Sequence, residues 1–139
     1  MSEDPIPLNP QEAHEFLQNT PDALLVDIRS SMEYLFVGHP IGSVHIAWID
    51  EPNWEVNSNF VKEVTALCES RNQDQPMDVP LVLICRSGKR TLDAGDLLIA
   101  YGFSQVMHVD EGFEGDKDQN NHRGTLGGWR FRGLPWEQC

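Results

Sequence analysis

The fold of this chain is decided by the stretch Pro80-Leu81-Val82-Leu83-Ile84-Cys85-Arg86-Ser87-Gly88-Lys89-Arg90. Its first half is apolar and of strand length, as expected for a parallel strand that is covered on both faces. Arg86-Ser87-Gly88 interrupts the strand, and the spacing of apolar residues from Thr91 to Tyr101 predicts a helix. A strand, a short loop with glycine and a helix in succession are typical of an α/β sheet.

The same alternation continues on both sides of this stretch. Strand-like apolar runs occur at 24–29, 43–47 and 104–110, and helical spacing occurs at 57–71. Near the N-terminus, Asn9-Pro10-Gln11-Glu12 is typical of a helix start with a capping box. This order predicts a parallel sheet with right-handed crossovers, and 139 residues suit a single domain. The tail from Glu111 onward offers no strong element.

Charge limits the partners that the sequence allows. The 22 acidic and 10 basic side chains give a formal net charge of −12. This balance argues against nucleic acid and membranes as partners, because nucleic acid and anionic membranes both bind clustered Lys and Arg. No apolar run approaches the ~20 residues of a membrane-spanning helix, and the acidic N-terminus does not resemble a signal peptide. We therefore expect a cytoplasmic location.

The chain has three cysteines, Cys68, Cys85 and Cys139. They form no C-x-x-C pair and show no zinc-like spacing, and their odd number argues against a disulfide framework. Cys68 falls on the apolar side of a predicted helix and is expected in the core. Cys139, the last residue, is expected to be an incidental terminal thiol.

Cys85 stands where an α/β sheet places its ligands, beyond the carboxyl end of a strand and before a helix. Loop amides and the helix dipole at such a point stabilise a negative charge, here a thiolate. Arg86, Lys89 and Arg90 add positive charge in an otherwise acidic chain. A buried structural cysteine beside solvated cations is the alternative, but the strand–loop–helix context favours a nucleophile.

Several ordered motifs resemble those of the rhodanese family. Cys85-Arg86-Ser87-Gly88-Lys89-Arg90 is similar to the active-site loop of rhodanese domains. Further similarity lies at 25–29, where the family has an Asp-x-Arg strand, and at 33–34, 38–46, 101–113 and 127–136. There are two departures: the order Pro40-Ile41, which is usually reversed, and a polar insertion at 114–125 where many single-domain members are shorter.

The resemblance implies an α/β fold in which a five-stranded parallel sheet carries helices on both faces. Residues 1–139 would form one domain, with its core at about 7–136. Cys85 would be the catalytic residue, at the bottom of a ring of loop amides. The substrate-binding loop would consist of Arg86, Ser87, Gly88, Lys89 and Arg90. Asp27 and Arg29 are expected to support the site as a structural ion pair, and the insertion either to form a flap near the loop or to be a surface excursion.

The implied activity is sulfur transfer by covalent catalysis. The Cys85 thiolate would take the sulfane sulfur of a small anionic donor such as thiosulfate and release sulfite. The resulting persulfide would pass its outer sulfur to a thiol, to a sulfur carrier or, in an assay, to cyanide. The resemblance implies no metal and no organic cofactor.

Two alternatives remain open. Cysteine phosphatases and arsenate reductases use C-x5-R, whereas Arg90 follows Cys85 at C-x4-R, which makes a tighter loop better sized for sulfur. A relay module that carries persulfide to a partner without turnover is the other alternative, and sequence does not separate it from an enzyme. His39 and His45 are expected to be structural groups, and Trp129 and Trp136 to be packing anchors.

Overall fold

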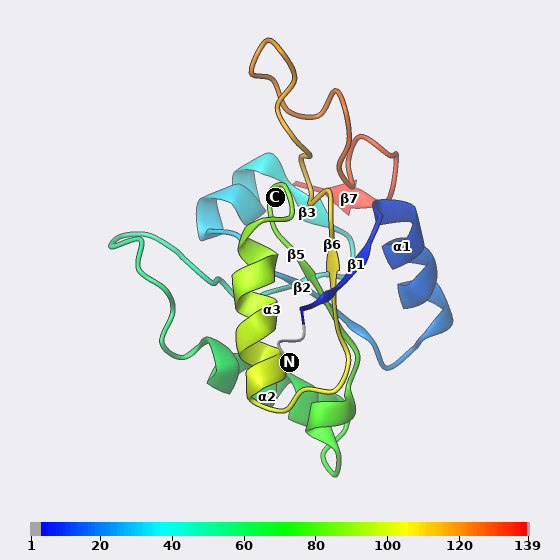
Figure 1. Ribbon diagram of the computed structural model, residues 1–139, viewed down its shortest axis with the longest axis vertical. Helices are drawn as coiled ribbons and strands as arrows, with labels where there is room; N and C mark the ends of the chain where they lie inside the picture. Colours follow the sequence, from blue (N-terminus) through cyan, green and yellow to red (C-terminus); the bar gives the residue numbers. More distant parts are fainter. Residues whose placement is uncertain (1–3, 139) are drawn as a thin grey trace.

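The computed structural model describes residues 4–138 of the chain. Short strands alternate with helices along most of it (Figure 1). The elements are β1 (Ile6–Leu8), α1 (Pro10–Asn19), β2 (Leu24–Asp27), the π-helix η1 (Glu33–Val37), β3 (His39–Pro40), β4 (Val44–His45), α2 (Phe60–Arg71), the 3-10 helix η2 (Pro76–Asp78), β5 (Leu81–Ile84), α3 (Arg90–Ala100), β6 (Val106–Val109) and β7 (Trp136–Glu137). Within residues 4–138, no helix is both long and apolar enough to cross a membrane.

Five strands form one parallel sheet in the order β1-β6-β5-β2-β4. The strand that precedes Cys85, β5, lies in the middle, with Leu83 in register with Val26 of β2 and with His108 of β6. Every pair of neighbouring strands in this sheet is parallel, so the carboxyl ends of all five strands lie at the same edge. The predicted five-stranded parallel sheet is confirmed.

Both faces of the sheet are covered, as predicted. On β2 and β5, alternate residues point to opposite faces because the side-chain period of a strand is two. Val26 and Leu83 join the helices α2 and α3 in one buried cluster, whereas Leu25 and Ile84 join α1 and the C-terminal segment in the other. Figure 1 shows α1 on one side of the strands and α2 and α3 on the other. This arrangement keeps apolar side chains out of water on both faces of β5.

The predicted start of the first helix is confirmed in atomic detail. The Asn9 side chain accepts a hydrogen bond from the Glu12 amide at 2.8 Å, and the Glu12 carboxylate accepts one from the Asn9 amide at 2.9 Å. The two bonds satisfy amides that the first turn of a helix leaves unpaired. The predicted N-cap and capping box therefore fix where α1 begins.

The tail differs from the sequence prediction, which gave it no strong element. Its β7 pairs with β3 in a small antiparallel sheet that places Trp136 opposite Pro40. The edge strand β1 was also not predicted. Strands of two or three residues are too short to show a hydrophobic period, so only the folded chain reveals them. Cys139 lies outside the described residues.

Candidate active site

Cys85 follows β5 directly and is 1% exposed. Its Sγ accepts a hydrogen bond from the Gly88 amide at 3.2 Å. Gly88 has a φ of +93°, and a side chain there would collide with the backbone of Asp110. Only glycine therefore allows the loop to curl tightly enough to bring this amide to the sulfur.

The loop presents further amides beside the sulfur. Of the predicted ring of amides around Sγ, the Gly88 amide is the one that donates a hydrogen bond to it. The amides of Arg86, Ser87 and Lys89 have no acceptor among residues 4–138. Lys89 is followed by α3, whose N-terminus carries no side-chain cap. Unpaired amides at a helix N-terminus are the arrangement that binds anions in proteins.

A polar chain leads from Cys85 into the interior. Sγ lies 3.8 Å from the Thr91 hydroxyl, which lies 2.8 Å from Nδ1 of His108. Thr91 is completely buried and His108 is nearly so, and burial holds the pKa of His108 below its usual value. In the neutral tautomer that carries its proton on Nδ1, His108 donates to the Thr91 oxygen. The hydroxyl hydrogen can then point toward an ionised sulfur and stabilise it.

The three cations of the loop do not share one role. Arg90 forms a bidentate pair with the Glu33 carboxylate, at 2.9 and 3.0 Å, so its charge is compensated. Arg86 and Lys89 are exposed and make no ion pair with any described residue. The sequence prediction grouped all three as anion-binding cations, whereas the structure leaves two of them available.

Glu33 fixes Arg90 and is itself held in its charged form. Burial opposes that charge, but the hydrogen bonds and charge of Arg90, together with the amide and hydroxyl of Ser30, outweigh burial and hold the pKa of Glu33 below its usual value. The pair connects η1 to the first turn of α3 beside the loop. Glu33 is therefore a positioning residue.

Asp27 and Arg29 form the predicted ion pair, at 2.7 Å, and both are completely buried. The Arg29 guanidinium also donates to the Gly38 carbonyl at 2.5 Å and lies 4.4 Å from the centre of the Phe113 ring. The Phe113 amide in turn donates to the carbonyl of Cys85 at 2.8 Å. The pair is thus linked to the Cys85 loop through Phe113, and among the described residues it forms no hydrogen bond with the Cys85 sulfur.

The segment after β6 supports the loop from the other side. The Arg86 carbonyl accepts hydrogen bonds from the amides of Glu114 and Gly115, at 2.9 and 3.2 Å. Gly112, with a φ of +70°, lies so close that a Cβ there would be 2.5 Å from the Arg86 carbonyl. The base of the polar insertion is therefore hydrogen-bonded to Arg86, the residue that follows Cys85.

Two hollows border the loop. One, of about 460 Å³, is lined by Met32, Ile49 and Trp54 with the polar or charged residues Ser30, Glu33, Arg86 and Arg90. The other, of about 440 Å³, lies between the loop and the polar insertion and is lined by Arg86, Ser87, Lys89, Asp116, Lys117 and Arg123. The sequence left two expectations for the insertion, a flap near the loop or a surface excursion. Its base lines the second hollow beside the loop, and its far part projects from the molecule (Figure 1).

The remaining candidates have structural surroundings. Cys68 is completely buried, and burial raises its pKa to about 11, so its thiol stays protonated and unreactive. The rings of His39 and His45 both stack on Tyr34, with centroids 3.9 and 4.6 Å away. Trp129 is 1% exposed and donates to the Pro135 carbonyl, as a packing anchor should.

Sequence analysis missed the supporting roles of Glu33, Thr91 and His108. Glu33 lies 57 residues from Arg90 in the chain, so no local pattern joins them. The sequence does carry a signal for His108, since it is a polar residue within the apolar strand β6, which lies next to the strand that precedes Cys85. A buried polar group beside a candidate site normally has a partner there.

The chain is similar to known rhodanese proteins. The family model of the rhodanese-like domain matches residues 9–119. Rv0390 from M. tuberculosis, known from a crystal structure, is 34% identical, with a TM-score of 0.78 over 96% of this chain and 97% of that one. The thiosulfate sulfurtransferase GlpE of Pseudomonas aeruginosa is 31% identical over 76% of this chain and 77% of its own length.

Other relatives extend over most of the chain at lower identity. An uncharacterised protein of Rickettsia conorii is 24% identical over 91% of this chain and 92% of its own length. The polysulfide-sulfur transferase homodimer of Wolinella succinogenes, at 22% identity and a TM-score of 0.60, shares the fold. The match of the family model, the parallel sheet and the cysteine loop at its carboxyl edge agree, and the chain belongs to the family of rhodanese-like domains.

Proposed function

We propose that this chain is a sulfurtransferase that carries sulfane sulfur on Cys85 as a persulfide. The observation that carries the proposal is the position of Sγ, which accepts from the Gly88 amide at 3.2 Å beside loop amides that have no acceptor among the described residues. Fixed amides of this kind stabilise an anion without reorganising. A relative named as a thiosulfate sulfurtransferase supports the class of donor.

In the loading step, the Cys85 thiolate attacks the sulfane sulfur of a small anionic donor such as thiosulfate. A bond forms between the two sulfur atoms, and the donor's own S–S bond breaks. Its electron pair leaves with sulfite, and Cys85 is left as an anionic persulfide, so the total charge is unchanged. The cations Arg86 and Lys89 attract the donor, and the loop amides hold the new anion.

In the discharge step, a thiolate acceptor attacks the outer sulfur of the persulfide. The Cys85 S–S bond breaks, its electron pair returns to Sγ, and the acceptor leaves as a persulfide. Thr91 stands within reach of Sγ, 3.8 Å away, and stabilises the returning charge. Cys85, the loop amides and Thr91 of α3 are the groups of the protein that these two steps use.

The arrangement of Arg90 disfavours a phosphatase. A cysteine phosphatase needs its loop arginine free to bind the phosphate, whereas Arg90 is held by Glu33 in a bidentate pair at 2.9 and 3.0 Å. A wider C-x5-R loop is also absent from the sequence. The relay without turnover remains the second candidate, because it would use the same persulfide.

The test is thiosulfate:cyanide turnover together with the intact mass of the protein after exposure to thiosulfate. We expect wild-type protein to gain the mass of one sulfur atom and to turn over. The Cys85→Ser variant should do neither while remaining folded by circular dichroism, whereas Cys68→Ala should keep most of the turnover. Undiminished turnover by Cys85→Ser would refute the proposal. Persulfide without turnover would instead favour the relay.

A further inference from the structure

The hollow between the Cys85 loop and the polar insertion has an unusual charge for this protein. We call it the insertion pocket. Its lining contains four cations, Arg86, Lys89, Lys117 and Arg123, and one carboxylate, Asp116. The whole chain has 10 basic side chains against 22 acidic ones. A large share of the positive charge is therefore collected at one place, next to the nucleophile.

The cations of the insertion pocket are not neutralised by neighbouring carboxylates. Among residues 4–138, the arginines that form ion pairs are Arg29, Arg90 and Arg132. None of these three lines the insertion pocket. Arg123 is held in place by a bond of 2.7 Å from its guanidinium to the Gly115 carbonyl. Since that acceptor is a neutral carbonyl, the charge of Arg123 remains available to a ligand.

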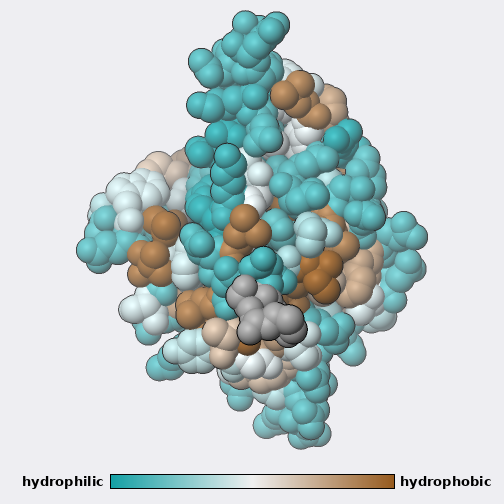
Figure 2. All heavy atoms as spheres, viewed as in Figure 1, coloured by the Kyte–Doolittle hydropathy of each residue, from teal (hydrophilic) through white to brown (hydrophobic). Residues whose placement is uncertain are grey.

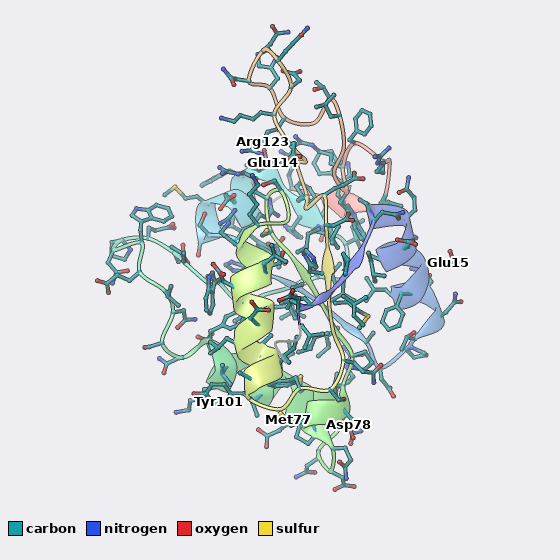
Figure 3. All side chains as sticks on the ribbon, viewed as in Figure 1. Glu15, Met77, Asp78, Tyr101, Glu114 and Arg123 are labelled. Atoms are coloured by element: carbon teal, nitrogen blue, oxygen red, sulfur yellow. The ribbon has the colours of Figure 1, made fainter. Side chains whose placement is uncertain are left out.

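The insertion is built as a fixed wall. At its base, the Gly124 amide donates to the Glu114 carbonyl at 2.9 Å, and Figure 3 shows Glu114 and Arg123 together at this point. At its tip, the Asp118 carboxylate accepts from the amides of Asn120 and His122 and from the Thr125 hydroxyl. Figure 2 shows the projecting segment covered by hydrophilic residues. These bonds order the backbone of the segment that carries Lys117 and Arg123, and both residues line the insertion pocket together with Arg86 and Lys89.

We infer that the insertion pocket binds the anionic part of the sulfur acceptor, which is a small thiol carrying at least two negative charges. The inference rests on the proposed sulfur transfer and names its acceptor. A volume of about 440 Å³ suits a metabolite-sized molecule and exceeds what thiosulfate needs. Three lining residues, Arg86, Ser87 and Lys89, belong to the loop that directly follows Cys85. The pocket therefore borders the loop that would hold the persulfide.

The chemistry of the acceptor is that of the discharge step. Its thiolate forms a bond to the outer sulfur, the Cys85 S–S bond breaks, and the electron pair goes to Sγ. The anionic groups of the acceptor stay in the pocket and do not react. Binding of these groups therefore orients the thiol and raises its local concentration without changing the reaction.

The test compares Lys117→Glu with Lys62→Glu, a matched change of an exposed lysine on α2 that lies outside the pocket lining. Protein loaded with sulfur is discharged in single turnovers by mercaptosuccinate, a dianionic thiol, and by uncharged 2-mercaptoethanol. We expect Lys117→Glu to slow discharge by mercaptosuccinate about fivefold and to leave 2-mercaptoethanol unchanged. Lys62→Glu should change neither rate. Single-turnover discharge by coenzyme A, a third acceptor, shows whether the pocket takes thiols whose anionic groups are phosphates rather than carboxylates.

A second measurement keeps the inference separate from the proposed function. Succinate has no thiol, so its binding, followed by amide chemical shifts of residues 86–89 and 115–124, does not depend on sulfur transfer. These shifts should weaken in Lys117→Glu and persist in Lys62→Glu. Equal discharge rates for both variants, in protein that loads normally, would overturn the acceptor site alone. Failure of the wild type to load would overturn the proposed function, whatever succinate does.

Discussion

At the residue scale, the loop separates cations that hold the structure from cations that face the solvent. Arg90 is engaged by Glu33, whereas Arg86 and Lys89 are exposed. An unpaired surface cation attracts anions over about a Debye length, ~10 Å at moderate salt, but takes no part in bond breaking. Loss of the Arg90 ion pair should therefore change the free energy of unfolding, whereas loss of Arg86 or Lys89 should change the KM for an anionic donor.

Arg86→Ala and Lys89→Ala should each raise the KM for thiosulfate about threefold and leave kcat almost unchanged, because these charges attract the donor and do not react. The measurement is steady-state turnover at low and high salt, and the difference from the wild type should shrink as salt screens the charges. Lys62→Ala serves as the control. Unaltered thiosulfate kinetics in both loop variants would mean that these side chains do not meet the donor.

Glu33→Gln should lower the free energy of unfolding by about 1–2 kcal/mol at pH 7, because it breaks the bidentate pair with Arg90. The folded-state pKa of Glu33 lies below 4.5, its ordinary value. The stabilisation is therefore fully present above that value and is lost as the pH falls through the folded-state pKa. Urea titrations across this range should show the wild type and the variant converging, and the exposed Glu15→Gln should match the wild type throughout. A gap independent of pH would contradict the role of the charge.

At the scale of elements, the site is a strand–loop–helix unit with a support on each side. The loop between β5 and α3 is bonded to the base of the insertion through the Cys85 and Arg86 carbonyls. Gly112 is the point of closest approach, where a Cβ would be 2.5 Å from Arg86. The position of the loop around the Cys85 sulfur thus depends on residues that follow β6, the neighbour of β5 in the sheet.

Gly112→Ala should reduce persulfide formation at least about tenfold, because the methyl group would displace the Arg86 peptide and misplace the loop amides. Gly133→Ala is the matched control, since Gly133 has a similar φ of +76° but open space around it. Both variants carry the cost of a left-handed backbone, about 1 kcal/mol, so a difference in sulfur loading between the folded variants reports on the contact of residue 112 with Arg86. Equal loading rates would show that the contact is not needed.

How far the sequence predicted the structure depends on how local each feature is. β5, the loop and α3 follow from an apolar run, a glycine and a helical period that lie within one stretch, and the capping box of α1 is equally local. The pairs Glu33–Arg90 and β3–β7 could not be predicted, because each joins distant parts of the chain and depends on the folded topology. The same holds for the Thr91–His108 contact, which needs β6 to lie beside β5.

At the scale of the whole molecule, the C-terminal segment closes the face of the sheet that carries α1. Trp136 pairs with Pro40 through β7 and lies edge-on to Phe113, with ring centroids 6.0 Å apart. The Phe113 amide in turn donates to the backbone carbonyl of Cys85. The tail therefore contributes to the packing behind the site although it lies beyond residues 9–119, which the family model matches.

Trp136→Ala should lower the free energy of unfolding by about 2 kcal/mol, because it removes a large aromatic side chain from this packing. Trp54→Ala should cost less than about 0.5 kcal/mol, since Trp54 is 54% exposed. Chemical denaturation followed by circular dichroism measures both. Similar losses for the two variants would show that the packing of the Trp136 side chain adds no more to stability than an exposed tryptophan does.

Cys85, the proposed nucleophile, directly follows the central strand of the five-stranded sheet. β5 has hydrogen-bonded neighbours on both edges, whereas β1 and β4 lie at the margins of the sheet. Marginal strands fray in brief local openings, but a central strand exchanges its amide hydrogens with deuterium only when the whole domain melts. The sulfur transfer proposed for Cys85 should consequently persist through local openings of the marginal strands, and be lost only on global unfolding, together with the most slowly exchanging amides.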